Sequence, residues 1–82
     1  MITEIGEPVK VGAVFDPEQT LQPKWFVWNN RKYSVQRVTF AWKVRDGNRI
    51  YHHFAVTDGA NVYDLTYDAG ALSWKLMTVS PM

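Results

Sequence analysis

Two adjacent histidines, His52 and His53, are the residues of this chain best suited to metal binding or acid–base chemistry. They lie in a run of alternating polar and apolar residues that is typical of a β-strand, where neighbouring side chains point to opposite faces of the sheet. The two imidazoles therefore cannot ligate one metal ion. In the register expected below, no Asp, Glu or Cys lies near them to complete a zinc site. We expect His52 to be a core histidine between Trp42 and Tyr67, and His53 to be solvated on the outer face.

The remaining nucleophiles and carboxylates form no catalytic pattern. The chain has no cysteine, which removes thiol chemistry and disulfide bonds. Asp64 is expected opposite Lys75 in a surface pair, and three more carboxylates fall at expected turns: Asp46, Asp58 and Asp68. The serines have no expected histidine or acidic partner, and the glycines are scattered among turns rather than gathered in a phosphate-binding loop. We therefore expect no enzyme activity, no cofactor and no metal.

Positive charge is concentrated in the middle of the chain. Residues 24–49 carry seven Lys and Arg against one Asp, a local charge of +6, whereas residues 1–23 sum to −3 and residues 50–82 to −2. Basic side chains interleaved with exposed aromatic rings on a small β-structure suit the phosphates and bases of single-stranded nucleic acid. The expected binding face lies on the outside of the sheet and comprises Trp25, Lys32, Arg37, Lys43, Arg45 and Tyr51.

The same basic segment also fits a solvated outer face that keeps an apolar sheet soluble and blunts its edges. In that interpretation Arg31, expected opposite Trp28, forms a structural cation–π pair at a hairpin tip. The whole chain carries only +1, which argues against strong nonspecific binding to nucleic acid. Two further interpretations stay open: a protein-interaction or homodimerisation module that uses exposed aromatics and a sheet edge, and a small-ligand binder at the mouth of the curled sheet around His52 and Trp42.

Length and composition indicate one small globular domain. A chain of 82 residues has room for a single core, and its hydrophobic fraction of 46% and charged fraction of 21% are typical of soluble proteins. No apolar run approaches the roughly 20 residues that span a bilayer, and the first ten residues lack the features of a secretory signal. We expect a cytoplasmic protein with no membrane contact, a single small all-β domain over residues 1–82 with its ordered core at about 8–78.

Turn signals divide residues 25–76 into short strands. Asn29 and Asn30 suit a type I′ turn, because asparagine tolerates the positive φ required at both positions. Residues 59–60 begin with glycine and suit a type II′ turn. A three-residue loop is expected at 46–48 and a two-residue loop at 69–70. These loops together place residues of the same parity on one face, which supports the register because a slip of one residue inverts a strand.

The resulting pattern predicts a strongly apolar inner face: Phe26, Tyr33, Val35, Val38, Phe40, Trp42, Val44, Ile50, Phe54, Val56, Tyr63, Leu65, Trp74 and Leu76. The parity changes between Val35 and Val38, so we expect a β-bulge or a sharp bend near Gln36 and Arg37. A further strand over residues 9–15 alternates in the same way and is placed to close the structure. The predicted fold is all-β, an antiparallel meander of five to six strands curled into a small barrel or roll.

The segment between residues 23 and 38 resembles a family of short bacterial proteins with a domain of unknown function. The matching pattern is Pro23-x-x-Phe26-x-Trp28-x-x-Arg31-x-Tyr33-x-Val35-x-x-Val38, then Trp42, Tyr51, Val62-Tyr63-x-Leu65-x-x-Asp68 and Trp74-x-Leu76. The similarity covers residues 8–77, with Asn30 where the family often has glycine. Core and turn residues carry it, so the resemblance implies a fold. Some members are associated with lesion-bypass-type DNA polymerases, which implies an accessory domain that contacts nucleic acid or a DNA-processing protein.

Overall fold

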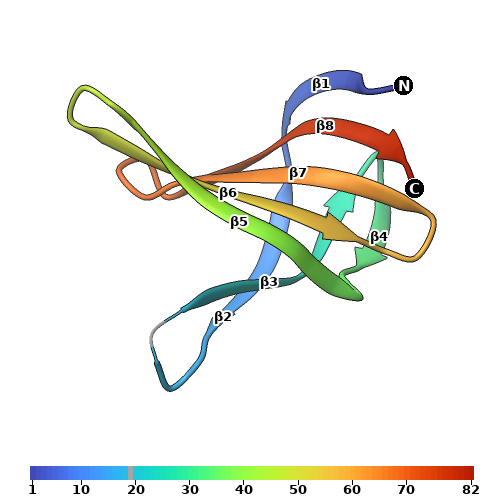
Figure 1. Cartoon of the computed structure of the whole chain (residues 1–82), viewed down its shortest axis with the longest axis horizontal. Helices are drawn as coiled ribbons and strands as arrows, with labels where there is room; N and C mark the ends of the chain where they lie inside the picture. Colours follow the sequence, from blue (N-terminus) through green and yellow to red (C-terminus); the bar gives the residue numbers. More distant parts are fainter. Residues whose placement is uncertain (19) are drawn as a thin grey trace.

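The computed structural model describes residues 1–18 and 20–82 and contains eight β-strands in two antiparallel sheets (Figure 1). The strands are β1 (Thr3–Pro8), β2 (Lys10–Phe15), β3 (Leu21–Trp28), β4 (Arg31–Ser34), β5 (Arg37–Asp46), β6 (Arg49–Thr57), β7 (Asn61–Asp68) and β8 (Ser73–Pro81). One sheet has the order β1-β8-β7-β6-β5 and the other the order β2-β3-β4. The all-β antiparallel prediction is confirmed, but eight strands replace the expected five to six. The described residues form two separate ladders and no closed barrel.

The chain passes from one sheet to the other at two bends. Val9 separates β1 from β2, and its N–H donates to the carbonyl of Trp74 at 3.2 Å. Residues 35–36 separate β4 from β5, and the N–H of Gln36 donates to the carbonyl of Thr57 at 2.8 Å. The bend expected at this second point is therefore present, as a crossing between sheets.

Two hairpins reverse direction at the predicted residues. Asn29 and Asn30 have φ values of 53° and 61°, as a type I′ turn requires. Gly59 has a φ of 98° at the first position of the 59–60 loop. The strands joined by each turn, β3 with β4 and β6 with β7, pair in the predicted register.

The side chains at the tip of the β3–β4 hairpin make different contacts from those expected. The guanidinium of Arg31 lies 5.7 Å from the ring centre of Tyr33, so the expected cation–π pair with Trp28 is wrong. The indole N–H of Trp28 instead donates to Glu7 Oε2 at 3.0 Å. This bond joins the three-stranded sheet to the edge strand β1.

The β5–β6 hairpin has a two-residue loop in place of the expected three-residue loop. Asp46 pairs with Arg49, which leaves only Gly47 and Asn48 unpaired. Gly47 has a φ of 62°, and glycine at the first loop position is what a type II′ turn favours. The expected three-residue loop is wrong because Asp46 belongs to the end of the strand and not to the loop.

A β-bulge in β5 compensates for the shorter loop. Residues 40–46 pair one position away from expectation, so their side chains lie on the opposite faces of the sheet. Thr39 is the extra residue of the bulge, and its hydroxyl donates to the Ala55 carbonyl at 2.9 Å. Beyond the bulge the expected pairing returns, with Val38 opposite Val56.

The loop between β7 and β8 spans residues 69–72 rather than the expected 69–70. The register moves by two residues, so the apolar residues of β8 keep the expected face at that end of the ladder. A further one-residue shift between Leu65 and Asp64 places Asp64 opposite Thr78, and its expected pairing with Lys75 is wrong.

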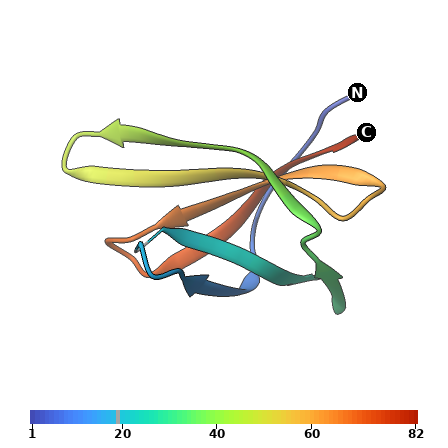
Figure 2. The same cartoon turned by 60° about the horizontal axis from the view of Figure 1, so that its bottom comes forward.

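The hydrophobic core lies between the two sheets, where the three-stranded sheet covers one face of the five-stranded sheet (Figure 2). Phe26 of β3 is fully buried, and its ring centre lies 5.0 Å from that of Tyr33 and 5.0 Å from that of Tyr63. The buried apolar side chains are Phe26, Phe54, Val56, Tyr63, Leu65 and Leu76. All six belong to the predicted inner face.

Four other residues of the predicted inner face lie elsewhere. Phe40 and Val44 are 64% and 42% exposed, and Trp42 stacks on His53 on the outer face, all because of the inversion in β5. Ile50 is 45% exposed because it lies near the tip of the β5–β6 hairpin. That hairpin projects past the strands of the three-stranded sheet (Figure 2).

The two ends of the chain lie side by side (Figure 1). Thr3 of β1 pairs with Val79 of β8, so strand pairing extends on both sides of the expected core at residues 8–78. Within the described residues no helix is long and apolar enough to cross a membrane.

Truncation of Phe26 tests this core. We expect Phe26→Ala to lower the free energy of unfolding by about 3–5 kcal/mol, because it leaves a cavity beneath two aromatic rings. The milder Phe26→Leu should cost about 1.5 kcal/mol or less, and the control Phe40→Ala less than about 1 kcal/mol. Urea denaturation followed by tryptophan fluorescence measures all three. Equal losses for Phe26→Ala and Phe40→Ala would contradict the core described above.

Candidate functional site

The outer face of the three-stranded sheet carries Trp25 with Lys32 and Lys10 beside its ring, which we call the outer aromatic group. The ring of Trp25 covers Gly12, where an added Cβ would lie 2.0 Å from Trp25 Cε2, so a larger residue would displace the ring. The ammonium groups of Lys32 and Lys10 lie 4.9 Å and 6.0 Å from the ring centre of Trp25. The structure therefore brings Trp25 and Lys32 of the expected binding face together.

The other four residues of the expected binding face do not lie on one surface. Lys43 and Arg45 lie on the inner side of the β5–β6 hairpin, whereas Tyr51 lies on its outer side. Arg37 starts β5 on the far side of the bulge. The expectation that Lys43 and Arg45 lie on the outer face with Tyr51 is wrong, and the one-residue difference in the hairpin loop is the reason.

A cleft runs between the two sheets along β3 and β5. It consists of two adjoining cavities of about 490 Å³ and about 340 Å³. The residues that line both are Thr20, Leu21, Ala41 and Phe54. The cleft is open because β4 pairs only with residues 25–28 of β3, so the first half of β3 has β2 on one side and no strand described on the other. We call it the inter-sheet cleft.

The inter-sheet cleft is lined by cations and by no anion among the described residues. Lys24 and Arg37 line the smaller cavity, and Lys43 lines the larger one. Gln22, which also lines the smaller cavity, donates to Asp16 Oδ2 at 3.1 Å. The Asp16 carboxylate is therefore already hydrogen-bonded by the protein. The lining favours an anionic ligand.

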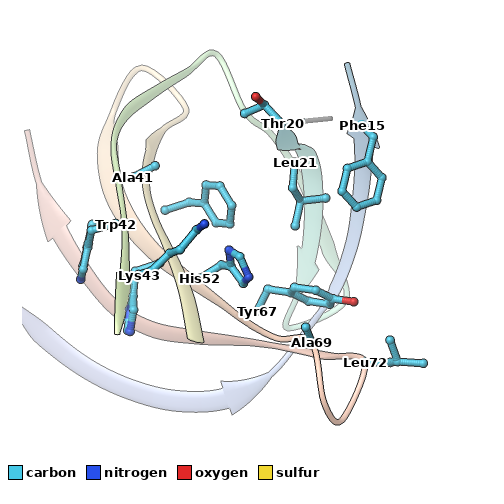
Figure 3. A pocket seen from close by; sticks show the side chains of 12 residues that line it. Phe15, Thr20, Leu21, Ala41, Trp42, Lys43, His52, Tyr67, Ala69 and Leu72 are labelled. Atoms are coloured by element: carbon cyan, nitrogen blue, oxygen red, sulfur yellow. The ribbon is translucent and has the colours of Figure 1, made fainter. Parts of the chain in front are cut away.

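Aromatic rings lie beside these cations. Figure 3 shows Lys43 and His52 directed into the larger cavity, with Phe15 on the opposite side. Phe15 is 69% exposed, so its ring is free to contact a ligand. Tyr67 lies next to His52, with 6.2 Å between the ring centres.

His52 therefore lines the cleft instead of lying in the core. Its predicted neighbour Tyr67 is correct, but Lys43 takes the place of Trp42 on the other side. Burial, together with the nearby Lys43 charge, lowers the pKa of His52 below the ordinary value of 6.5. The ring is consequently neutral near pH 7, when it can stack and donate one hydrogen bond.

His53 occupies the outer face, as expected, but it is packed rather than solvated. Its ring stacks on Trp42 with 4.9 Å between centres, and Nδ1 lies 3.0 Å from Thr66 Oγ1 and 3.4 Å from Asp64 Oδ1. Thr66 is only 8% exposed, and its hydroxyl is hydrogen-bonded to Asp64 Oδ1 at 3.2 Å. Nowhere in residues 1–18 or 20–82 do three or more His, Cys, Asp or Glu side chains gather as a metal site would require.

The expected binding face omits several residues that line the cleft, among them Phe15, Lys24 and Tyr67. Lys24 belongs to the basic segment, so the charge pattern contains a signal for it. Phe15 and Tyr67 come from strands of different sheets, β2 and β7. Only the packing of the sheets brings them to one cavity.

No protein-family model, curated protein or solved structure matches this chain. The resemblance to a family of short bacterial proteins stays a prediction.

The titration of His52 tests the geometry of the larger cavity. Proton NMR should show a midpoint for His52 below 6.5. Lys43→Gln should raise that midpoint, because it removes a nearby positive charge that disfavours the imidazolium. The matched change Lys75→Gln, on the outer face, should leave it unmoved. A midpoint that does not respond to Lys43→Gln would contradict the contact between these two side chains.

Proposed function

We propose that this protein is a non-catalytic module that binds single-stranded nucleic acid in the inter-sheet cleft. The observation that carries the proposal is the charge of the cleft: Lys24, Arg37 and Lys43 line it, and no carboxylate does so among the described residues. The chain as a whole carries only +1, so this asymmetry does not follow from overall charge. Closely spaced cations are what a phosphate backbone requires.

The aromatic lining supports a single strand over a duplex. Phe15, Tyr67 and the neutral ring of His52 offer flat faces within the larger cavity. Unpaired bases can stack on such rings, whereas a duplex keeps its base faces stacked on each other. Stacking and phosphate contacts in one groove are the combination used by proteins that bind single strands with little sequence preference.

We further infer that the two sheets act as one curled roll, open along the cleft. The bends at Val9 and at residues 35–36 support this, because the strands on either side of each bend pair in different sheets. Strands that switch sheets in this way form the corners of small orthogonally packed β-structures. In such a roll the inter-sheet cleft is the seam that backbone hydrogen bonds leave open.

A second candidate function is a protein-interaction module. The specific observation in its favour is the exposure of Phe40 and Val44, at 64% and 42%, on an edge strand of the larger sheet. Exposed apolar side chains on an unpaired edge are a common means of recruiting another chain. This surface lies on the face of β5 opposite the one that lines the inter-sheet cleft.

Charge reversal in the cleft tests nucleic-acid binding. We expect a labelled oligothymidylate to bind with an affinity that falls as salt rises, with a log–log slope of about −2 for three cations at about −0.7 each. Arg37→Glu combined with Lys43→Glu should abolish binding near physiological salt, because each change replaces a phosphate partner by a repelling charge. Fluorescence anisotropy over a salt series measures both effects.

The matched control makes the same change in charge outside the cleft, by Arg31→Glu combined with Lys75→Glu. It should keep a slope close to that of the unmodified chain. Equal loss in both double variants, or no binding of the unmodified chain at low salt, would contradict the proposal. Binding of a single nucleotide as tight as that of the oligomer would show a small-ligand site instead.

Separate aromatic variants distinguish the cleft from the outer aromatic group. Phe15→Ala should weaken oligothymidylate binding by about 1–3 kcal/mol, the usual cost of losing one stacked base. Trp25→Ala removes a ring on the outer face of the other sheet and should leave the affinity unchanged. The reverse result would place the nucleic acid on Trp25 and its flanking lysines, outside the inter-sheet cleft.

A further inference from the structure

β5 presents a long unpaired edge. It spans ten residues, Arg37–Asp46, and is the outermost strand of its sheet, with β6 as its one neighbour among the described strands. Phe40 and Val44 on its outer face are 64% and 42% exposed. A long edge strand with exposed apolar side chains is a template for pairing with another strand.

We propose that two copies of this chain join through β5, antiparallel, about a twofold axis at Trp42. In such a pair, residues directly opposite each other share a face, so the axis must coincide with a residue. With the axis at Trp42, Phe40 of one copy lies opposite Val44 of the second copy, on the outer face. On the inner face, Lys43 lies opposite the small and exposed Ala41 of the second copy.

Other axis positions are less compatible with the residues of β5. Axes at residues 43–45 place Lys43 or Arg45 of one copy opposite a cation of the other, which is destabilising on a sheet. Axes at residues 40–41 run the new pair into the bulge at Thr39. The position at Trp42 is the one that uses the regular part of the strand and pairs the two exposed apolar residues.

The twofold symmetry also places the two inter-sheet clefts relative to each other. What this means for nucleic acid rests on the proposed function. A twofold axis perpendicular to the sheet turns the inner faces of both copies to the same side. The two clefts then flank the joined β5 strands, and Lys43 of each copy lies near their common centre. A single strand longer than one cleft would contact both copies.

Sedimentation velocity without nucleic acid tests the dimer. The unmodified chain should sediment as a concentration-dependent dimer. Phe40→Lys and Val44→Glu should each weaken it about tenfold or more, because each loses two symmetric apolar contacts. The combined variant should restore the dimer, since each new lysine faces a new glutamate of the second copy. Within one copy these positions lie four residues apart, about 13 Å along the strand, so a defect in the monomer is not corrected this way.

Ile2→Lys, an equally polar change at another exposed apolar residue, should leave the dimer intact. A monomer at all concentrations, or no recovery in the combined variant, would overturn the proposal and leave the edge to a different partner strand. The outcome is separable from that of oligonucleotide binding. A dimer that binds no oligonucleotide contradicts the proposed function alone, and a monomer that binds one contradicts the dimer alone.

Discussion

The contact between Phe26 and Tyr63 is the interaction on which the rest of this structure depends. Phe26 lies in β3 and Tyr63 in β7, and their rings meet edge to face with 5.0 Å between centres, which holds the two sheets together. Burial raises the pKa of Tyr63, and its hydroxyl donates to Asp58 Oδ2 at 2.8 Å. The same carboxylate accepts the N–H groups of Ala60 and Asn61; these bonds outweigh burial and lower the pKa of Asp58. One side chain therefore fixes both the core ring and the β6–β7 turn.

This link between a turn and the core explains which parts of the fold can be predicted from the sequence. The turns at 29–30 and 59–60 have residues that tolerate positive φ and that join strands whose apolar residues are buried, so local and tertiary preferences agree. Around Gly47 the local preference of the turn and the tertiary burial of the strands do not constrain each other. The strands of that hairpin project beyond the three-stranded sheet (Figure 2), and without burial on one face the alternation of residues does not select a register. The preference of Gly47 for a type II′ turn then sets the register of the hairpin, and the bulge at Thr39 restores the expected pairing at Val38.

The same one-residue change of register in the β5–β6 hairpin explains why the sequence predicts only part of the candidate site. Arg37 and Lys43 belong to the expected binding face through both their charge and their parity. Both line the inter-sheet cleft, although Lys43 lies on the inner side of the hairpin instead of the expected outer face. The grouping with Tyr51 depended on parity and failed. Phe15 and Tyr67 could not be assigned to a common site from the sequence, because their proximity arises from how one sheet lies across the other rather than from any spacing along a strand.

Strand length sets the extent of both exposed surfaces: β4 has four residues and β5 has ten. At about 3.3 Å a residue, β4 covers roughly 13 Å of the neighbouring strand, and β5 extends to roughly 33 Å. The chain leaves the small sheet at residues 35–36, before β4 has covered the first half of β3, and this leaves the inter-sheet cleft open. β5 then continues as an edge that no described strand accompanies. Lengthening β4 would therefore close the cleft, and shortening β5 would remove the edge.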